Sequence, residues 1–140
     1  MNTKKFIIAS LVVFVLYEVL SYLIHGVILS KAYMDTADLW RSVEDMSSKS
    51  WIIWVGDLVK AFLFVYIFIK GLENKGWMEG VRFGVVFGLY VGIGKGIGTN
   101  ATTPNPFSHA LQWVAFTVVQ LVLCGVAAAL VYKPKKSKAA

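Results

Sequence analysis

Four charged side chains interrupt long apolar stretches of this sequence, and they are Glu18, Asp57, Lys60 and Lys95. A charge at the centre of a membrane-spanning helix costs about 2.5–3.5 kcal/mol, so four unpaired charges would together cost about as much as the stability of a whole domain. The four groups must therefore pair, reach the membrane surface, become neutral or line water. The charges of two acids and two lysines sum to zero, which favours ion pairs among the four side chains.

Glu18 lies at the middle of its apolar stretch, and two interpretations of it are open. It is either an acid that binds and releases a proton or an ion-pair partner of Lys60, which lies at a similar depth in the second stretch. Asp57 precedes Lys60 by three residues, so the two share one helical face and suit an intrahelical ion pair. Lys95 lies near the end of the third stretch, where a lysine can reach the lipid headgroups.

Polar residues also share one face on three of the expected helices, at 100° per residue. The faces hold Glu18, Ser21, Tyr22 and His25 in the first, Asp57, Lys60 and Ala61 in the second, and His109, Gln112, Gln120 and Cys124 in the fourth. A polar interior of this kind is typical of a binding pocket, a proton route or interhelical hydrogen bonding. The candidate binding or proton-linked residues are Glu18, Tyr22, His25, Asp57, Lys60, Lys95 and Gln120.

The sequence argues against an enzyme and against a resident metal or cofactor. It contains no GxxxxGK[ST] phosphate loop, no GxSxG nucleophile elbow, one cysteine and two histidines. Because it also lacks a nucleophile–base pair and a metal triad, we predict no catalytic residue, no metal ligand and no cofactor. A haem held by His25 and His109 is the one alternative, and no other residue supports it.

The composition indicates a membrane protein. Of the 140 residues, 57% are hydrophobic and 16% are charged, against about 45–50% and about 25% in ordinary soluble domains. Four continuously apolar stretches, residues 6–29, 51–69, 78–97 and 107–132, reach the roughly 20 residues that a spanning helix needs. We therefore predict an all-α, single-domain transmembrane four-helix bundle over residues 1–140 in a lipid bilayer, with a disordered basic tail at 133–140.

The distribution of lysine and arginine predicts the orientation of this bundle. Nine such residues lie in the N-terminal segment, the second connection and the C-terminal tail: Lys4, Lys5, Lys70, Lys75, Arg82, Lys133, Lys135, Lys136 and Lys138. Three lie in the first connection, and the third connection has none. Because cytoplasmic loops carry the excess of positive charge, both termini are expected in the cytoplasm and the protein in the inner membrane. The positive charges suit lipid headgroups and not nucleic acid.

The connections have their own signals. Apolar residues recur at helical spacing over residues 35–46, with acids between them, which predicts a short amphipathic helix on the outer surface. Asn105 followed by Pro106 is typical of an N-cap and a first helical position. Residues 99–105 would then form a short polar turn before the fourth helix.

Glycine recurs at every fourth position of the third stretch, at Gly80, Gly84, Gly88, Gly92 and Gly96. This spacing lets another helix approach closely. The partner is either a helix of the same bundle or a second copy or another membrane protein. A helix that is broken within residues 92–98 is the third alternative, because this segment is rich in glycine.

Short segments of the chain resemble a known family. They are His25-Gly26, Leu39-Trp40-Arg41, Glu79-Gly80-Val81-Arg82 and Leu111-Gln112-Trp113. Together with the layout they resemble small four-span bacterial inner-membrane proteins that form a domain-of-unknown-function family, which implies no activity. The chain is also similar in length to small multidrug transporters, which have an essential acid in their first span, where this chain has Glu18. It departs from them in its further span charges and its acidic first connection.

These observations lead to two functional expectations. The first is a non-enzymatic integral membrane protein that acts through its buried polar cluster or as a partner subunit. The alternative is a small proton-coupled transporter in which Glu18 is the titrating acid.

Overall fold

The structure, a computed structural model, describes residues 1–73 and 75–133. In this part of the chain all regular structure is helical, which confirms the predicted all-α class. Four of its helices are long and apolar enough to cross a membrane, as a multi-pass membrane protein requires. They are α1 (Thr3–Ser21) with its continuation to Ile28, α4 (Ser50–Lys70), α5 (Trp77–Thr102) and α6 (Phe107–Val131). The predicted disordered tail lies, except for Lys133, outside the described residues.

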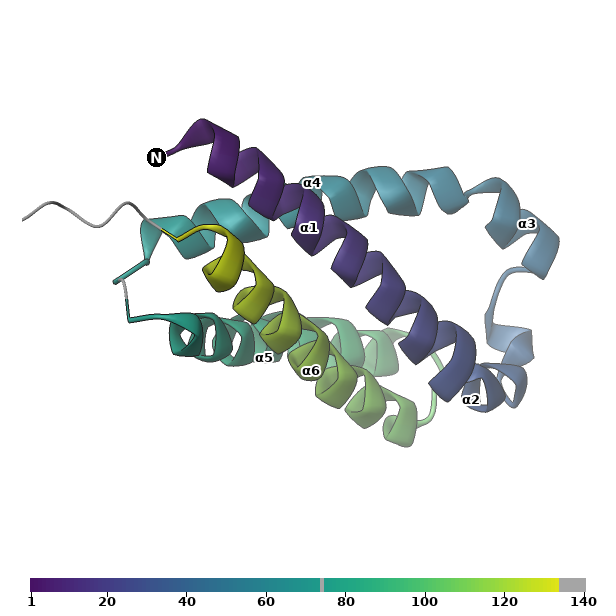
Figure 1. The fold of residues 1–140 in the computed structure, drawn as a ribbon. Coiled ribbons are helices and arrows are strands. Elements are labelled where there is room, and N and C mark those ends of the chain that lie inside the picture. The colour runs from purple at the N-terminus through teal and green to yellow at the C-terminus, as the bar shows by residue number, and fades with distance from the viewer. Residues whose placement is uncertain (74, 134–140) are drawn as a thin grey trace, which may run out of the picture.

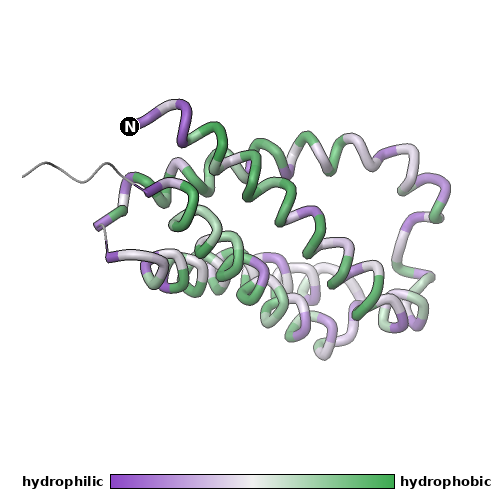
Figure 2. Tube along the Cα trace, in the orientation of Figure 1, coloured by the Kyte–Doolittle hydropathy of each residue, from purple (hydrophilic) through white to green (hydrophobic). Residues whose placement is uncertain are grey.

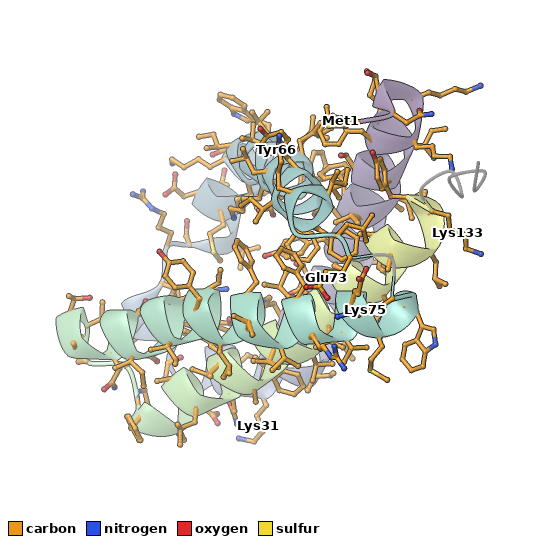
Figure 3. All side chains as sticks on the ribbon, turned by 90° about the vertical axis from the view of Figure 1, so that its left-hand side faces the viewer. Met1, Lys31, Tyr66, Glu73, Lys75 and Lys133 are labelled. Carbon is orange, nitrogen blue, oxygen red and sulfur yellow. The ribbon has the colours of Figure 1, made fainter. Side chains whose placement is uncertain are left out.

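The long helices form a bundle in which α1 crosses the other helices obliquely and contacts both α4 and α6, while α5 and α6 lie side by side (Figure 1). The N-terminus and the α4–α5 connection lie at one end of the bundle, called here the near end and viewed end-on in Figure 3. There the Asn2 backbone N–H donates to the Tyr132 hydroxyl at 3.0 Å. The short segments between α1 and α4 and the α5–α6 connection lie at the opposite, far end. Hydrophobic residues cover most of the long helices (Figure 2).

Polar side chains define the helix boundaries at the near end. The Asn2 side chain accepts a hydrogen bond from the Lys5 backbone N–H at 3.0 Å and caps α1. One Glu79 carboxylate oxygen accepts from the backbone N–H groups of Glu73 and Lys75, both at 2.8 Å. These bonds tie the α4–α5 connection to the first turn of α5. Gly76 precedes α5 with a φ of 83°, a conformation that favours glycine.

The first span changes its helical form before it ends. After α1 the chain continues as a π-helix over Tyr22–Ile28, and the Leu29 N–H donates to the Ile24 carbonyl, five residues earlier, at 2.8 Å. A π-helix is rare and often lies at a functional site. Because each turn contains more residues than in an α-helix, side chains beyond Ser21 leave the stripe that 100° spacing predicts.

The third span is longer than predicted. It was expected to end at residue 97, with a polar turn at 99–105, but α5 is continuous to Thr102. The Thr102 hydroxyl donates to the Gly98 carbonyl at 3.1 Å, and the Thr103 hydroxyl donates to the Thr99 carbonyl at 2.7 Å. These bonds satisfy carbonyls of the last turn and stabilise its end. The broken helix considered for residues 92–98 is therefore wrong.

The glycine face of α5 lies against α6. All five glycines of the fourfold repeat are buried, and the backbone of α6 is so close that a Cβ on Gly88 would lie 2.7 Å from the Val118 Cα. Gly125 of α6 faces Gly80 in the same way. The repeat therefore serves a helix contact inside this chain, and a second protein would have to contact α5 on another face.

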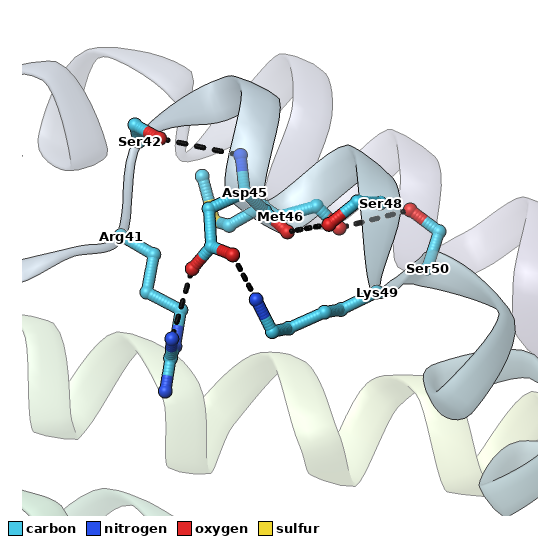
Figure 4. Close-up of polar contacts among 7 residues, drawn as sticks. All are labelled: Arg41, Ser42, Asp45, Met46, Ser48, Lys49 and Ser50. Carbon is cyan, nitrogen blue, oxygen red and sulfur yellow. Dashed lines mark hydrogen bonds and ion pairs between the residues drawn. The ribbon is translucent and has the colours of Figure 1, made fainter.

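The first connection consists of several short segments instead of one amphipathic helix over residues 35–46. It contains α2 (Ser30–Met34), a 3₁₀ turn at Ala37–Leu39 and α3 (Val43–Ser48). Trp40 is extended between the last two and packs its ring on Trp113, with the ring centroids 5.8 Å apart. Packing of the partly buried Trp40 against α6 interrupts the helical path. The Ser42 side chain then caps a new helix by accepting from the Asp45 N–H at 3.2 Å (Figure 4).

Replacing Asp45 by alanine is expected to change stability little, although Asp45 joins two cations at the start of α3. It pairs with Arg41 at 2.8 Å and with Lys49, and all three side chains are partly or largely exposed (Figure 4). Exposed pairs contribute about 0.2–1 kcal/mol each, so Asp45→Ala is expected to lower the unfolding free energy in detergent by roughly 1 kcal/mol or less. Ser42→Ala, which removes the cap, should cost a similar amount, about 0.5–2 kcal/mol. A loss well above 2 kcal/mol for Asp45→Ala would contradict this view.

Two apolar clusters fill the bundle at different depths. The larger, near-end cluster is built from Ala9, Val13, Ala61, Phe64, Val65, Phe68, Leu121, Cys124, Ala128 and Tyr132. Phe64 packs on Phe83 of α5 with ring centroids 4.8 Å apart, which joins α4 to α5 in this half. The smaller, far-end cluster contains Ile24, Leu29 and Trp113. The charged residues of the spans lie between these clusters.

Candidate functional site

A polar layer crosses the middle of the bundle, and its members are Glu18 of α1, Asp57 and Lys60 of α4 and Gln120 of α6. The predicted faces of the first, second and fourth spans therefore meet. The layer separates the two apolar clusters, so its charges interact in surroundings that screen them less than water does.

Lys60 pairs with the acid on its own helix. Its Nζ lies 2.6 Å from an Asp57 carboxylate oxygen, one turn earlier. The Asp57 side chain is only 6% exposed, whereas the Lys60 side chain is 69% exposed. The aliphatic part of the Lys60 side chain therefore lies mostly outside the protein interior, and its ammonium group contacts Asp57 at the edge of the layer. The alternative in which Lys60 pairs with Glu18 is not formed, since Glu18 makes no ion pair with a described residue.

Glu18 faces the second acid. Its helix, α1, packs against α4, and its carboxyl group is close enough to the Asp57 carboxyl group for the two to interact. Its Oε1 atom is buried and has no hydrogen-bond partner in the described part of the chain. Two adjacent carboxylates repel each other, and one proton between them turns that repulsion into a hydrogen bond.

Gln120 connects α6 to α1 beside this pair. Its amide Nε2 donates to the Tyr17 carbonyl at 3.0 Å and to the Ser21 hydroxyl at 2.8 Å. Gln120 is buried, so its amide loses its hydrogen bonds to water when the protein folds. The two bonds to α1 replace them. The structure thus gives Gln120 the role of an interhelical hydrogen-bond donor, whereas Gln112 is exposed.

Tyr22 and His25 do not belong to the layer, although both were predicted on the stripe of Glu18. Tyr22 is 70% exposed and makes no side-chain hydrogen bond to a described residue. His25 lies toward the far end, where its Nδ1 is 2.7 Å from the Tyr33 hydroxyl. The π-helix explains the position of His25, because it changes the direction of the side chains along Tyr22–Ile28. Tyr22 itself still donates its backbone N–H to the Glu18 carbonyl as in an α-helix, so its exposure has another cause.

The Tyr33 hydroxyl joins three segments at the far end. The Trp113 Nε1–H donates to it at 2.9 Å, which leaves the hydroxyl proton free for His25 Nδ1. The ring of Tyr33 lies 5.4 Å from that of Trp40, centroid to centroid. Burial raises the pKa of Tyr33, and the bond from Trp113 partly offsets this. We call Tyr33, Trp40, Trp113 and His25 the far-end latch.

The far-end latch was not predicted from the sequence. An aromatic residue before a span and a tryptophan inside one are common at membrane interfaces. Their spacing along the chain does not show that they meet. The only available signal was the presence of donors and acceptors on buried rings, which must find partners.

The two histidines are held in separate contacts. The Nδ1 atom of His109 is 2.9 Å from Asn105 Oδ1. Asn105 therefore does not cap α6 as predicted, and Pro106 occupies the cap position. The ring of Tyr33 lies next to both histidine rings, at 5.8 Å from His25 and 6.4 Å from His109. No group of three metal-ligating side chains occurs among residues 1–73 and 75–133.

Lys95, a charged residue within the third span, makes no ion pair with a described carboxylate. Its Nζ lies 5.6 Å from the ring centroid of Trp113, within the range of a cation–π contact. Lys95 therefore lies at the edge of the far-end latch.

No protein-family model matches the chain, and neither a curated protein nor a solved structure shows significant similarity to it. The resemblance drawn from short motifs stays a prediction. The fold alone defines the class, a multi-pass α-helical membrane protein with a polar layer inside its bundle.

Proposed function

We propose that the protein is a small proton-coupled transporter whose proton site is the Glu18–Asp57 carboxyl pair. The observation that carries the proposal is the position of Glu18. One of its two carboxyl oxygens, Oε1, is buried and has no hydrogen-bond partner among the described residues, and the Asp57 carboxyl group is nearby. A standing ion pair would have put a lysine in that position. An intramembrane acid without a cation is typical of proton relays and transport sites.

The membrane and orientation form part of the same proposal. Lys5 and Lys133 are in contact at the near end, where the Lys5 ammonium group donates to the Lys133 carbonyl. Lys75 lies at this end as well (Figure 3). Since cytoplasmic segments carry the excess of positive charge, the near end faces the cytoplasm and the bilayer is a bacterial inner membrane.

The test is an infrared difference titration of the purified protein in lipid. The carbonyl band of a protonated carboxyl group is expected to appear and disappear with pH while the protein stays folded. In Glu18→Gln this change should be lost or strongly altered, since the remaining Asp57 is then paired with Lys60 alone. Glu44→Gln, in the exposed helix α3, is the matched control and should leave the band unchanged. A band that ignores pH, or that is the same in all three proteins, would overturn the proposal.

A partner subunit is the second candidate, and one observation favours it. Five consecutive side chains at the far end of α4, Trp51, Ile52, Ile53, Trp54 and Val55, are each more than half exposed. A partner helix could cover this part of α4. If Glu18→Gln leaves the cellular role of the protein intact while charged substitutions at Trp51 and Trp54 abolish it, the partner role becomes the better account.

A further inference from the structure

The half of α4 that points toward the far end, residues 50–60, is largely uncovered by the rest of the bundle. The side chains of Trp51, Ile52, Ile53, Trp54 and Val55 are each more than half exposed. Five consecutive residues make more than one full turn of a helix, so this part of α4 is exposed on every side. We call residues 50–60 the far half of α4.

The contacts that hold α4 in the bundle lie mostly beyond this half. Before Lys60, Asp57 is the one buried residue of the helix. The rings of Phe64 and Phe68 pack on α5 at Phe83, with centroids 4.8 Å and 5.5 Å apart, and both follow Lys60 toward the near end. Figure 1 shows the far half of α4 lying apart from α5 and α6. Lys60 therefore stands where α4 leaves the bundle.

Lys60 is the residue of this half that lipid cannot cover. It is the central residue of α4 (Ser50–Lys70), about 15 Å along the helix from either end. Its Nζ lies 2.6 Å from an Asp57 carboxylate oxygen, which keeps the ammonium group about two turns inside the far end of the helix. The Lys60 side chain is nevertheless 69% exposed. Lipid tails suit the neighbouring Val59, whereas a charge at this depth requires polar surroundings.

Asp57 satisfies only part of this requirement. An ammonium group has three N–H donors, and Asp57 accepts one hydrogen bond from Lys60. Among the described residues no other acceptor contacts the Lys60 ammonium group. Because the acid of this pair is buried and the base is exposed, the pair presents its positive end outward. A carboxylate is the side chain that complements such a surface best.

A second copy of this chain is a poor source of that carboxylate. The acids in the interior of the spans are Glu18 and Asp57. The Asp57 side chain is 6% exposed, and the Oε1 atom of Glu18 is buried. A symmetric contact between two α4 helices would also bring the two Lys60 ammonium groups to the same depth, where they repel each other. The acid must therefore come from a different protein.

We infer that the far half of α4 binds a transmembrane helix of another protein, and that this helix carries an acidic side chain at the depth of Lys60. The carboxylate accepts the hydrogen bonds that Asp57 leaves open, and apolar residues of the partner helix cover the exposed side chains around Lys60. The inference rests on the partner role, the second candidate for the function, and not on proton coupling.

The experiment measures binding of labelled model helices to the labelled protein in phosphatidylcholine vesicles by fluorescence energy transfer. The probes are three synthetic leucine-rich transmembrane peptides of equal length, which carry Glu, Leu or Lys at the central position. The Glu peptide is expected to bind the wild type about threefold to thirtyfold more tightly than the Leu peptide, as for polar contacts between helices in a membrane. The Lys peptide should bind no more tightly than the Leu peptide.

Variants of α4 assign this preference to Lys60. Lys60→Met should bind the Glu and Leu peptides equally, whereas Lys60→Arg, which keeps the charge, should still prefer the Glu peptide. Lys70→Met is the matched control, because it removes an exposed lysine from the end of the same helix, and it should keep the preference. The comparison of peptides on the wild type needs no variant, so it stands even where Lys60→Met fails to fold.

Three results would overturn the inference. Equal binding of the three peptides to the wild type would mean that water reaches the Lys60 ammonium group and no acid is needed. A preference for the Glu peptide that persists in Lys60→Met would place the contact elsewhere. Energy transfer between two labelled copies of the protein that disappears in Lys60→Met would make a second copy the partner.

The peptide assay and the infrared titration of the carboxyl groups fail independently. Preference for the Glu peptide in a protein whose carboxyl groups do not titrate would support the docking face and contradict the proposed transporter. Carboxyl groups that titrate in a protein without this preference would contradict only the docking face.

Discussion

Gly84→Ala is expected to separate α5 from α6 and to destabilise the whole bundle. An added Cβ would lie 2.5 Å from the Leu121 carbonyl oxygen and 2.7 Å from the Val122 backbone nitrogen, with the Val122 Cα nearer still. Backbone atoms of a helix cannot turn aside as a flexible side chain can, so the two helices must move apart. Overpacking of this kind costs about 1–3 kcal/mol or more, and in a membrane close packing is a main source of helix association.

Gly94→Ala is the matched control, because it makes the same change in the same helix. A Cβ at Gly94 would meet nothing within 4 Å. Alanine is favoured over glycine inside a helix by up to about 1 kcal/mol, so this variant should keep or gain stability. Thermal unfolding in detergent measures both. Equal stability of the two variants would show that the α5–α6 contact is looser than the structure has it.

The spans could be predicted because their physical cause lies in consecutive residues. A bilayer requires a certain length of apolar helix, and that length can be counted along the chain. The glycine spacing could be interpreted for the same reason, since every fourth residue of a helix returns to one face. The choice of α6 as the partner of that face could not be predicted, because any close-packed helix satisfies the same pattern.

The first connection was predicted less well because a tertiary contact decides it. The spacing over residues 35–46 suits one helix, and local propensity favours it. Burial of the Trp40 ring against Trp113 in α6, about 70 residues later in the chain, opposes it. Such a contact is absent from any local pattern, so the helical path is interrupted where the ring must turn inward.

The sequence predicted which residues form the candidate site, but not which of them pair with each other. Charges inside apolar stretches identify Glu18, Asp57 and Lys60 without a structure, because their cost in lipid demands an explanation. Lys60 can pair with either acid, and the choice depends on how α1 is rotated relative to α4. The sequence does not give that angle. The helical wheel also fails after Ser21, since it assumes α-helical spacing where the chain forms a π-helix.

Tyr33→Phe is expected to weaken the far end of the bundle by about 1–3 kcal/mol, although it removes a single oxygen. The Trp113 ring is 5% exposed, and its Nε1–H donates to the Tyr33 hydroxyl at 2.9 Å. Without that oxygen the donor stays buried and has no acceptor, which is the costly way to lose a hydrogen bond. His25 Nδ1 loses its partner in the same variant.

Tyr22→Phe provides the control for this variant, since it makes the same chemical change in an exposed residue of the first span. It should leave thermal unfolding in detergent unchanged. Equal effects of Tyr33→Phe and Tyr22→Phe would mean that the far-end latch contributes nothing to stability.

The stability that the far-end latch contributes should also decrease at alkaline pH, because burial raises the pKa of Tyr33 above its ordinary value of 10.0. A group that folding keeps protonated stabilises the folded state fully below its unfolded pKa, and this contribution is lost as the pH rises through the folded pKa. As the pH rises above about 10, the wild type should therefore lose more stability than Tyr33→Phe, which has no hydroxyl to ionise. Since the lysines titrate in both proteins, the difference between the two curves isolates the hydroxyl. Parallel curves would show that Tyr33 is as accessible to water in the folded protein as in the unfolded chain.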